Sequence, residues 1–398
     1  MLSRRDFLGR SALIALAPTI PAFLARTARA LPPDRDGRIL VVIQLDGGND
    51  GINTVVPFSD DAYARSRKSL RLEKERLIKI DDRTALHASL GELDKLLHGG
   101  RLAIVQGVGY PNPSRSHAQS MAVWQSASLD PENQNGYGWL GRALDGDGHR
   151  RPGAPASVFL GTGACPIALR GRRSLPTAID RLEEFQLSRE ASAARSLCQA
   201  GGASDLAAFI HRSALDAYAT ADRLQAAAAG SETSVTYPQT RLAEQLHLIG
   251  RLIKAGFSAR VYYAVHSGYD THAGQLFVHA NLLRELSQAI GAFMQDLAAA
   301  KLDDRIAVMT FSEFGRQLRE NASAGTDHGT AAPMFLAGNS VRAGLAGKAP
   351  SLTDLHDGEP KMTVDFRRVY ASILQQWLGL RSEETSGGSL TALDLFAG

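Results

Sequence analysis

Acidic and histidine side chains follow four apolar segments that have the composition of buried strands. Carboxylate oxygens and neutral imidazoles are ligands that Zn²⁺, Mn²⁺ and Fe²⁺ accept together in proteins, and Ca²⁺ is a further candidate. Two ions about 4 Å apart, bridged by a carboxylate, would need about this number of ligands. The candidate metal ligands are Asp46, Asp270, His272, Glu313, Asp327 and His328.

The same residues also suit an ordinary structural role. Asp, Gly, Thr and Ser are common in turns and helix caps, so any one of the four clusters could be only a turn. If the preceding strands are parallel, however, their carboxyl ends meet at one edge of the sheet. Four clusters at one edge favour a binding site over four unrelated turns.

A hydroxyl-rich segment, Ser114-Arg115-Ser116-His117, precedes a helical stretch that reaches Trp124. Ser114 or Ser116 can cap this helix. A hydroxyl at a helix N-terminus beside an arginine can instead act as a nucleophile or bind an anion. Taken alone, the segment favours capping.

Four apolar runs predict the strands that position these groups. They lie at residues 39–45, 102–107, 260–265 and 306–311. Runs of this kind are expected of strands buried on both faces of a parallel sheet, and helical segments between them supply the crossovers. The sequence therefore predicts an α/β fold in which a mainly parallel sheet is sandwiched between helical layers.

Shorter segments complete the predicted architecture. Residues 157–161 and 167–169 are expected to add short strands, and residues 365–378 a last helix. Residues 204–256 show helical spacing on both sides of a polar turn, which predicts a helical hairpin laid over one face of the sheet. All of these segments belong to one expected domain, residues 31–398.

The first 30 residues have the features of a twin-arginine export signal. Arg4 and Arg5 precede a Phe-Leu pair, and Ala28 and Ala30 supply the small residues of a cleavage site. The apolar segment between them is shorter than the roughly 20 residues that span a bilayer, so stable membrane insertion is not expected. The sequence predicts export by the twin-arginine translocase to the periplasm or the extracellular space.

Cleavage after residue 30 changes the charge of the chain. The full sequence has 44 basic and 41 acidic residues and a formal net charge of +3, whereas residues 31–398 have a net charge of −1. No basic stripe remains, so a nucleic-acid partner is not expected. Cys165 and Cys198 are the only cysteines, and export makes a disulfide between them possible.

Several motifs together resemble an exported family called domain of unknown function 1501. The resemblance covers nearly all of residues 31–398 and rests on the twin-arginine leader and on QLDGGNDGINTVVP, SRSH, YDTHAGQ, FSEFGR, GTDHGTAAPMFLAG and DFRRVYASILQQWLG. That family is similar to the alkaline phosphatase and sulfatase superfamily. The resemblance implies a parallel sheet between helical layers, a hydroxyl or thiol nucleophile at a helix start, and one or two bound metals.

The resemblance also implies roles for individual residues. Asp46 matches the metal-binding Asp after the first strand, and Asp270 with His272 matches a later metal pair at a tighter spacing than usual. Ser116 fits the nucleophile position best, and Ser114 fits it second.

One position departs from the superfamily pattern. Glu313 is followed by Phe314, where superfamily enzymes commonly have Asp-His-Gly. His328 then most resembles the late metal histidine, and one metal site is expected to be incomplete or absent.

Two functional hypotheses remain open from the sequence. In the first, the protein is a metal-dependent hydrolase of phosphate or sulfate esters, in which Ser116 is the nucleophile and Arg115 or Arg316 offsets negative charge in the transition state. In the second, it is a catalytically silent relative that binds a sugar or a cell-envelope anion in the same cleft. Phe314 favours the second hypothesis, whereas Ser116 and the Asp270–His272 pair favour the first. Both hypotheses imply a small anionic or sugar-like ligand.

Overall fold

The computed structural model describes residues 37–134, 136–147, 155–174, 176–180, 233–257, 259–382 and 390–397. The expectations for residues 1–30, for Cys198 and for the first helix of the predicted hairpin lie outside these ranges. The helices are α3 Gly51–Thr54, α4 Asp61–Ser66, α5 Gly91–His98, α6 His117–Ser126, α7 Trp139–Asp145, α10 Arg241–Lys254, α11 Gln275–Ala299 and α12 Phe366–Ser372, with short 3-10 turns between them.

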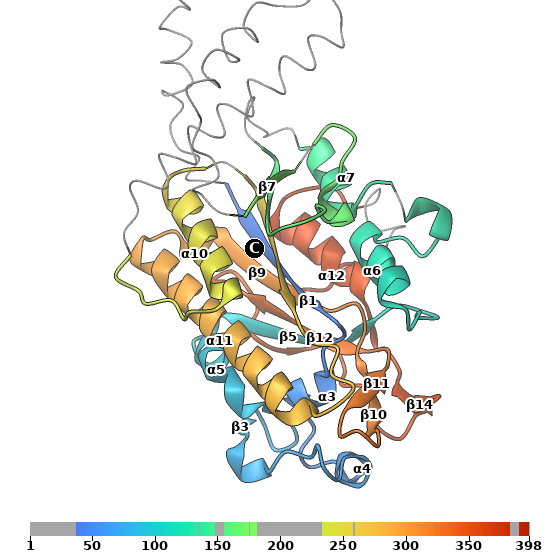
Figure 1. Ribbon diagram of the computed structural model, residues 1–398. Coiled ribbons are helices and arrows are strands. Elements are labelled where there is room, and N and C mark those ends of the chain that lie inside the picture. Colours follow the sequence, from blue (N-terminus) through green and yellow to red (C-terminus); the bar gives the residue numbers. More distant parts are fainter. Residues whose placement is uncertain are drawn as a thin grey trace, which may run out of the picture.

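A nine-stranded sheet forms the centre of the described structure (Figure 1). Its strand order is β13-β5-β12-β9-β1-β8-β6-β7, and β16 also pairs with β5. Its strands are β1 Ile39–Asp46, β5 Leu102–Gly109, β6 Ser157–Leu160, β7 Thr177–Ile179, β8 Val261–Ser267, β9 Ile306–Phe311, β12 Ala332–Ala337, β13 Gly344–Ala346 and β16 Val364–Asp365.

Most strand pairs in this sheet are parallel. β1 pairs in parallel with both β8 and β9, and β6 pairs in parallel with β8. Only β12 is antiparallel, and it lies between β5 and β9. The four long predicted strands are β1, β5, β8 and β9 of this one sheet, so the predicted mainly parallel sheet is confirmed.

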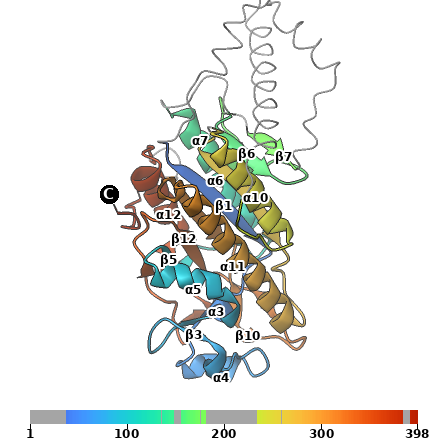
Figure 2. The same cartoon turned by 90° about the vertical axis from the view of Figure 1, so that its left-hand side faces the viewer.

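Side chains of β1 alternate between two hydrophobic cores. Leu40 and Val42 pack with residues of α6, α7 and α12, whereas Val41 and Ile43 pack with residues of α5, α10 and α11. Figures 1 and 2 show these two groups of helices on opposite faces of the sheet. Because successive side chains of a strand point to opposite faces, burial on both faces accounts for the unbroken apolar run.

Small elements lie beyond the carboxyl end of β1, at the lower end of the molecule in Figure 1. A three-stranded sheet contains β2 Val55–Val56, β3 Ile78–Lys79 and β4 Ala85–Leu86. Two hairpins follow later in the chain: β10 Arg316–Glu320 with β11 Thr326–His328, and β14 Leu355–His356 with β15 Glu359–Pro360.

The predicted strand at residues 167–169 is wrong. Ile167–Leu169 forms a 3-10 turn instead, because Leu169 N–H donates to Pro166 O and Arg170 N–H donates to Ile167 O. These local hydrogen bonds use the groups that a strand would offer to its neighbour, and β7 takes the edge position. The last predicted helix begins as α12 and continues as a π-helical turn, Ile373–Trp377.

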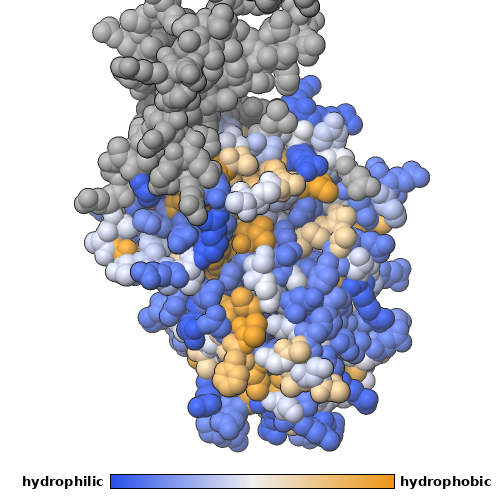
Figure 3. Space-filling view, viewed as in Figure 1, coloured by the Kyte–Doolittle hydropathy of each residue, from blue (hydrophilic) through white to orange (hydrophobic). Residues whose placement is uncertain are grey.

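The surface seen in Figure 3 is mostly polar, with apolar patches running down the middle of this face. Phe277 and Val278, near the start of α11, are among the exposed large apolar side chains. Among the helices in the described ranges, none combines the length and apolar character needed to cross a lipid bilayer.

Candidate metal centre

Ligand atoms from three parts of the chain meet beyond the carboxyl ends of β5 and β8. In the described part of the chain, one ligand atom from each of His117, Asp270 and His328 lies within 4.8 Å of the other two. His272 joins them, because its Nε2 atom lies 2.9 Å from His328 Nε2 and 3.1 Å from Asp270 Oδ1. We call these four residues the histidine cluster.

Each imidazole of the histidine cluster has its Nδ1 atom beside a hydrogen-bond acceptor. A neutral imidazole has one N–H, so these acceptors place the proton on Nδ1 and leave a lone pair on Nε2. The contacts are His117 Nδ1 to Glu313 Oε1 at 2.8 Å, His272 Nδ1 to Asp327 Oδ1 at 3.2 Å and His328 Nδ1 to the Arg115 carbonyl oxygen at 2.8 Å.

The Nε2 atoms face a common carboxylate. His328 Nε2 lies 3.0 Å from Asp270 Oδ1, and His117 Nε2 lies 3.5 Å from Asp270 Oδ2. Nitrogen lone pairs and carboxylate oxygens repel one another at these distances, so the arrangement needs either additional protons or a cation among them.

The donor set fits a transition-metal ion. Ligand atoms that would each lie 2.0–2.2 Å from one ion are separated from one another by about 3 to 3.5 Å, close to the 2.9 to 3.1 Å separations among His272, His328 and Asp270. Imidazole nitrogens suit Zn²⁺, Mn²⁺ or Fe²⁺, whereas Ca²⁺ prefers six to eight oxygen ligands. Glu313 and Asp327 are placed behind His117 and His272, where carboxylates orient metal-binding imidazoles in proteins.

Asp270 is held in its ionised form by its neighbours. Partial burial would raise the pKa of its carboxyl, but the positively charged Arg316 guanidinium, which donates to Asp270 Oδ1, helps to hold that pKa below its usual range. At neutral pH the histidine cluster therefore contains a negative charge that favours a bound cation.

Arg316 is fully buried beside the cluster and supports its loops. The guanidinium donates to the carbonyl oxygens of Gly48 at 2.7 Å and Tyr269 at 2.9 Å, and to that of Gly47. It also donates to Asp270 Oδ1 at 2.8 Å. Since its donors are occupied in this way, Arg316 positions the Gly47 loop and Asp270.

The loop after β1 must pass very close to the chain around Asp270. Gly47 has a φ of +120°, and a Cβ atom there would lie 2.4 Å from the Asp270 nitrogen. The Gly47 N–H donates to Glu313 Oε1 at 2.9 Å. Glycine at this position thus lets the loop after β1 contact the segments that follow β8 and β9.

Ser116 and Arg115 lie next to the cluster along the chain. Ser116 has the backbone conformation of an N-cap for α6, but its hydroxyl makes no capping hydrogen bond. Ser114 Oγ instead accepts from the Ser116 N–H at 3.1 Å and donates to Gln119 at 2.8 Å. The Arg115 guanidinium donates to Glu359 at 2.5 Å and lies 3.7 Å from Asp357, while its carbonyl oxygen contacts His328.

Asp46 is placed apart from the histidine cluster. Its carboxylate accepts a hydrogen bond from Gln44 Nε2 at 3.0 Å, and it is not among the convergent ligand atoms of the described residues. The other predicted ligands are either in the cluster, as are Asp270, His272 and His328, or next to it, as are Glu313 and Asp327.

Sequence reasoning missed His117 as a candidate ligand. The signal available was its place in the SRSH motif, at the first position of a helix that follows a buried strand. Phe314 packs against this histidine and against His328, with ring centroids 5.0 and 4.4 Å apart. His117 therefore supplies an imidazole close to the position where Phe314 replaces one in the sequence pattern.

Comparison with solved structures finds similar proteins at low identity. The crystal structure of Ps i-CgsB in complex with k-i-k-neocarrahexaose has a TM-score of 0.41 and 10% identity, covering 88% of this chain and 74% of that chain. The PsFucS1 sulfatase from Pseudoalteromonas sp. has a TM-score of 0.38 and 11% identity, covering 84% and 68%. A protein in the alkaline phosphatase superfamily from Vibrio parahaemolyticus has a TM-score of 0.41 and 9% identity, covering 88% and 69%.

No curated protein matches the chain in sequence. A family model does match, over residues 38–386, and its description is "Protein of unknown function (DUF1501)". The matched segment contains every residue of the histidine cluster and all the strands of the central sheet. The chain therefore belongs to the DUF1501 family.

Proposed function

We propose that the protein is a metal-dependent hydrolase of phosphate or sulfate esters, with one metal ion bound by His117, Asp270, His272 and His328. The observation that carries this proposal is the approach of three imidazole Nε2 atoms, each with its Nδ1 beside an acceptor, to the Asp270 carboxylate. A bound divalent ion would stabilise negative charge on the ester oxygens and lower the pKa of a nearby hydroxyl.

Ser116 is the proposed nucleophile. It immediately precedes His117, and its hydroxyl is not used to cap α6. In the proposed step, Ser116 Oγ forms a bond to phosphorus or sulfur while the bond from that atom to the alcohol oxygen breaks. The proton lost by Ser116 is balanced by the proton that the departing alcohol gains, and water then hydrolyses the serine ester.

The test is hydrolysis of p-nitrophenyl phosphate and p-nitrophenyl sulfate by residues 31–398. Ser116→Ala is expected to abolish turnover while retaining the metal, and Ser114→Ala serves as the matched control that keeps most of the activity. Turnover that survives in Ser116→Ala would contradict the nucleophile assignment. If the metal-loaded wild-type protein hydrolyses neither ester, the hydrolase proposal is wrong.

A second candidate function is binding without catalysis, of a sugar or a cell-envelope anion. One observation favours it: the guanidinium groups of both Arg115 and Arg316 already have partners, namely Glu359 for Arg115, and backbone carbonyls and Asp270 for Arg316. The positive charge of each guanidinium is therefore already offset in part by a carboxylate. Retained metal and measurable anion binding without turnover would support this alternative.

The compartment is part of the proposal. We infer from Arg4, Arg5 and the Ala28-x-Ala30 pattern that the twin-arginine translocase exports the chain and that residues 1–30 are then removed. A periplasmic or extracellular location would give the site access to sulfated or phosphorylated molecules of the cell envelope.

A further inference from the structure

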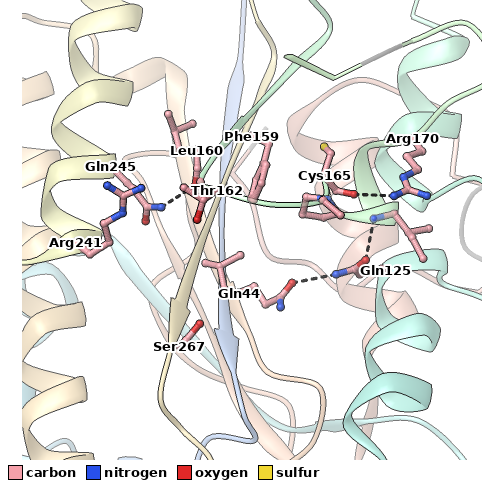
Figure 4. A pocket seen from close by; sticks show the side chains of 15 residues that line it. Gln44, Gln125, Phe159, Leu160, Thr162, Cys165, Arg170, Arg241, Gln245 and Ser267 are labelled. Atoms are coloured by element: carbon pink, nitrogen blue, oxygen red, sulfur yellow. Dashed lines mark hydrogen bonds between the residues drawn. The ribbon is translucent and has the colours of Figure 1, made fainter. Parts of the chain in front are cut away.

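A pocket of about 560 Å³ opens at the carboxyl ends of β6 and β8 (Figure 4). In the strand order of the sheet, β6 and β8 lie on one side of β1 and β5 lies on the other. Its volume is in the range of about 300–1,000 Å³ that is typical of small-molecule sites. Gln44 and Ser267 lie at its floor, and Gln245 of α10 and Gln125 of α6 lie on opposite sides. Nothing in the proposed hydrolysis at the histidine cluster uses this pocket.

Gln245 presents an unpartnered acceptor in this pocket. The side chain is 6% exposed, and its Nε2 donates to the Leu160 carbonyl oxygen at 2.7 Å. A carbonyl oxygen can only accept, so this contact fixes the amide nitrogen toward Leu160 and leaves Oε1 as the second polar atom. Gln245 Oε1 is buried and has no hydrogen-bond partner in the described structure. Leaving a buried acceptor unpaired is unfavourable, so a donor from a ligand would be bound favourably.

The charge of the pocket favours an anion. Among the residues that the structure describes, two arginines and no acidic residue line it. Arg241 is paired with Asp180. The guanidinium of Arg170 donates to the Cys165 carbonyl oxygen at 3.1 Å and contacts no carboxylate among the described residues. Arg170 therefore supplies a positive charge that no carboxylate of the described residues neutralises.

The floor of the pocket is held in place by a hydrogen-bond network. Gln44 Oε1 accepts from Tyr263 at 2.5 Å and from Gln125 at 3.1 Å, while Gln44 Nε2 donates to Asp46. All of these residues lie on strands or helices. A site built in this way is already formed before a ligand binds, which limits the entropy lost on binding.

The pocket is also close to the histidine cluster along the chain. Ser267 at its floor precedes Asp270 by three residues, so their Cα atoms are at most about 11 Å apart. Asp46 lies between the two sites as well, because it accepts from Gln44 and its carbonyl oxygen accepts from the Tyr269 N–H at 3.1 Å. A substrate with a sugar-sized group on its ester would have to span this distance to occupy both sites.

We propose that this pocket binds a hydroxylated sugar ring that carries its own sulfate or phosphate group, with a ring hydroxyl donating to Gln245 Oε1 and the anion facing Arg170. The inference rests on the proposed function in one respect: the sugar in the pocket is taken to be the alcohol part of the ester that is hydrolysed at the histidine cluster. The substrates are then sugar esters with an anionic group in addition to the one at the metal.

The test is isothermal titration of residues 31–398 with glucose 6-sulfate, glucose 6-phosphate and unmodified glucose. The wild-type protein should bind both charged sugars more tightly than glucose, and the sulfate and phosphate arms decide which anion is preferred. Arg170→Met should remove this advantage, and Gln245→Leu should weaken all three ligands about five- to tenfold. Arg172→Met removes the same charge two residues away, outside the pocket lining, and should change none of these affinities.

Two controls keep the inference separate from the proposed hydrolysis. Binding is measured again after metal removal by a chelator, because pocket binding should persist even if the hydrolase proposal is wrong. Hydrolysis of p-nitrophenyl phosphate, which lacks a sugar, is measured in the control variant Arg172→Met, outside the pocket lining, and should equal that of the wild-type protein. Equal affinities of wild type, Arg170→Met and Gln245→Leu, with thermal unfolding showing that both variants are folded, would overturn the inference, as would binding that disappears with the metal.

Discussion

The Nε2 atoms of His272 and His328 lie 2.9 Å apart, and both lie about 3 Å from the same carboxylate oxygen of Asp270. Each ring has an acceptor at its Nδ1 atom, which is Asp327 for His272 and the Arg115 carbonyl for His328. Two neutral rings oriented in this way direct lone pairs at each other. This relationship is the structural basis for proposing a cation at the site.

The carboxylate of Glu313 should control metal affinity through His117. Glu313 is 1% exposed and its Oε1 atom lies 2.8 Å from His117 Nδ1. Glu313→Gln keeps the shape of the side chain but replaces the charged acceptor of the His117 hydrogen bond with a neutral one. We therefore expect metal affinity to fall about 10- to 100-fold. Chelator competition measures the affinity. Glu320→Gln is the control, because the Glu320 carboxylate accepts from the N–H groups of Ser69 and Leu70 instead of an imidazole, and equal affinities in the two variants would contradict the role of Glu313.

Gly47 should be required for the approach of the β1 loop to Asp270. Gly47→Ala places a Cβ atom 2.4 Å from the Asp270 nitrogen at a φ of +120°. We expect the free energy of unfolding to fall by about 1–3 kcal/mol or more, because both backbone strain and a clash arise. Denaturant unfolding measures this change. Gly100 also has a positive φ but nothing within 4 Å of its Cβ position, so Gly100→Ala should cost less, and an equal loss would argue against the clash.

Two buried histidines should make the fold sensitive to mild acid. Burial lowers the pKa of His87 and that of His279 to about 4, from a usual value of 6.5. Between pH 6.5 and 4 the unfolded chain therefore binds more protons than the folded chain, so stability falls as the pH is lowered through this window. For one such residue the loss is about 3 kcal/mol.

His279→Gln tests this pH dependence. Glutamine does not titrate and can still donate to Asn49 Oδ1, which lies 2.9 Å from His279 Nε2. Unfolding free energies at pH 7, 5.5 and 4 should then decline less steeply for the variant than for wild type. Parallel declines in the two proteins would show that His279 is not responsible.

Export should depend on the two arginines near the N-terminus. Arg4→Lys with Arg5→Lys keeps the charge but removes the twin-arginine pattern. We expect the double variant to stay in the cytoplasm with residues 1–30 attached, as judged by fractionation and by the mass of the chain. Unchanged export of the double variant through the same pathway would rule out this signal.

The sheet was largely predictable because its strands are buried on both faces. The apolar runs at β1, β5, β8 and β9 encode this burial directly. The direction of β12 was not predictable, since an apolar run does not indicate whether the strand is parallel or antiparallel to its neighbours. The turn at Ile167–Leu169 was mistaken for a strand because three apolar residues carry no periodicity that separates the two.

The candidate site was predictable in its residue types but not in its geometry. Strand ends indicated where Asp270, His272 and His328 would gather. The orientation of Asp46 toward Gln44 depends on which face of β1 its side chain occupies at the strand end. Likewise, the sequence suggests that the Arg316 guanidinium can contact a ligand. Only the fold shows that it donates hydrogen bonds to backbone carbonyl oxygens.

The most direct test of the histidine cluster is the metal content of residues 31–398, purified from the exported fraction and measured by inductively coupled plasma mass spectrometry. We predict about one transition-metal ion per chain in the wild-type protein, retention of that ion in Asp46→Asn, and its loss in Asp270→Asn and His328→Ala. Circular dichroism confirms that each variant is folded. A wild-type protein that holds no ion, even after incubation with Zn²⁺, Mn²⁺ or Fe²⁺, or variants that all retain the ion equally, would contradict the proposed metal centre.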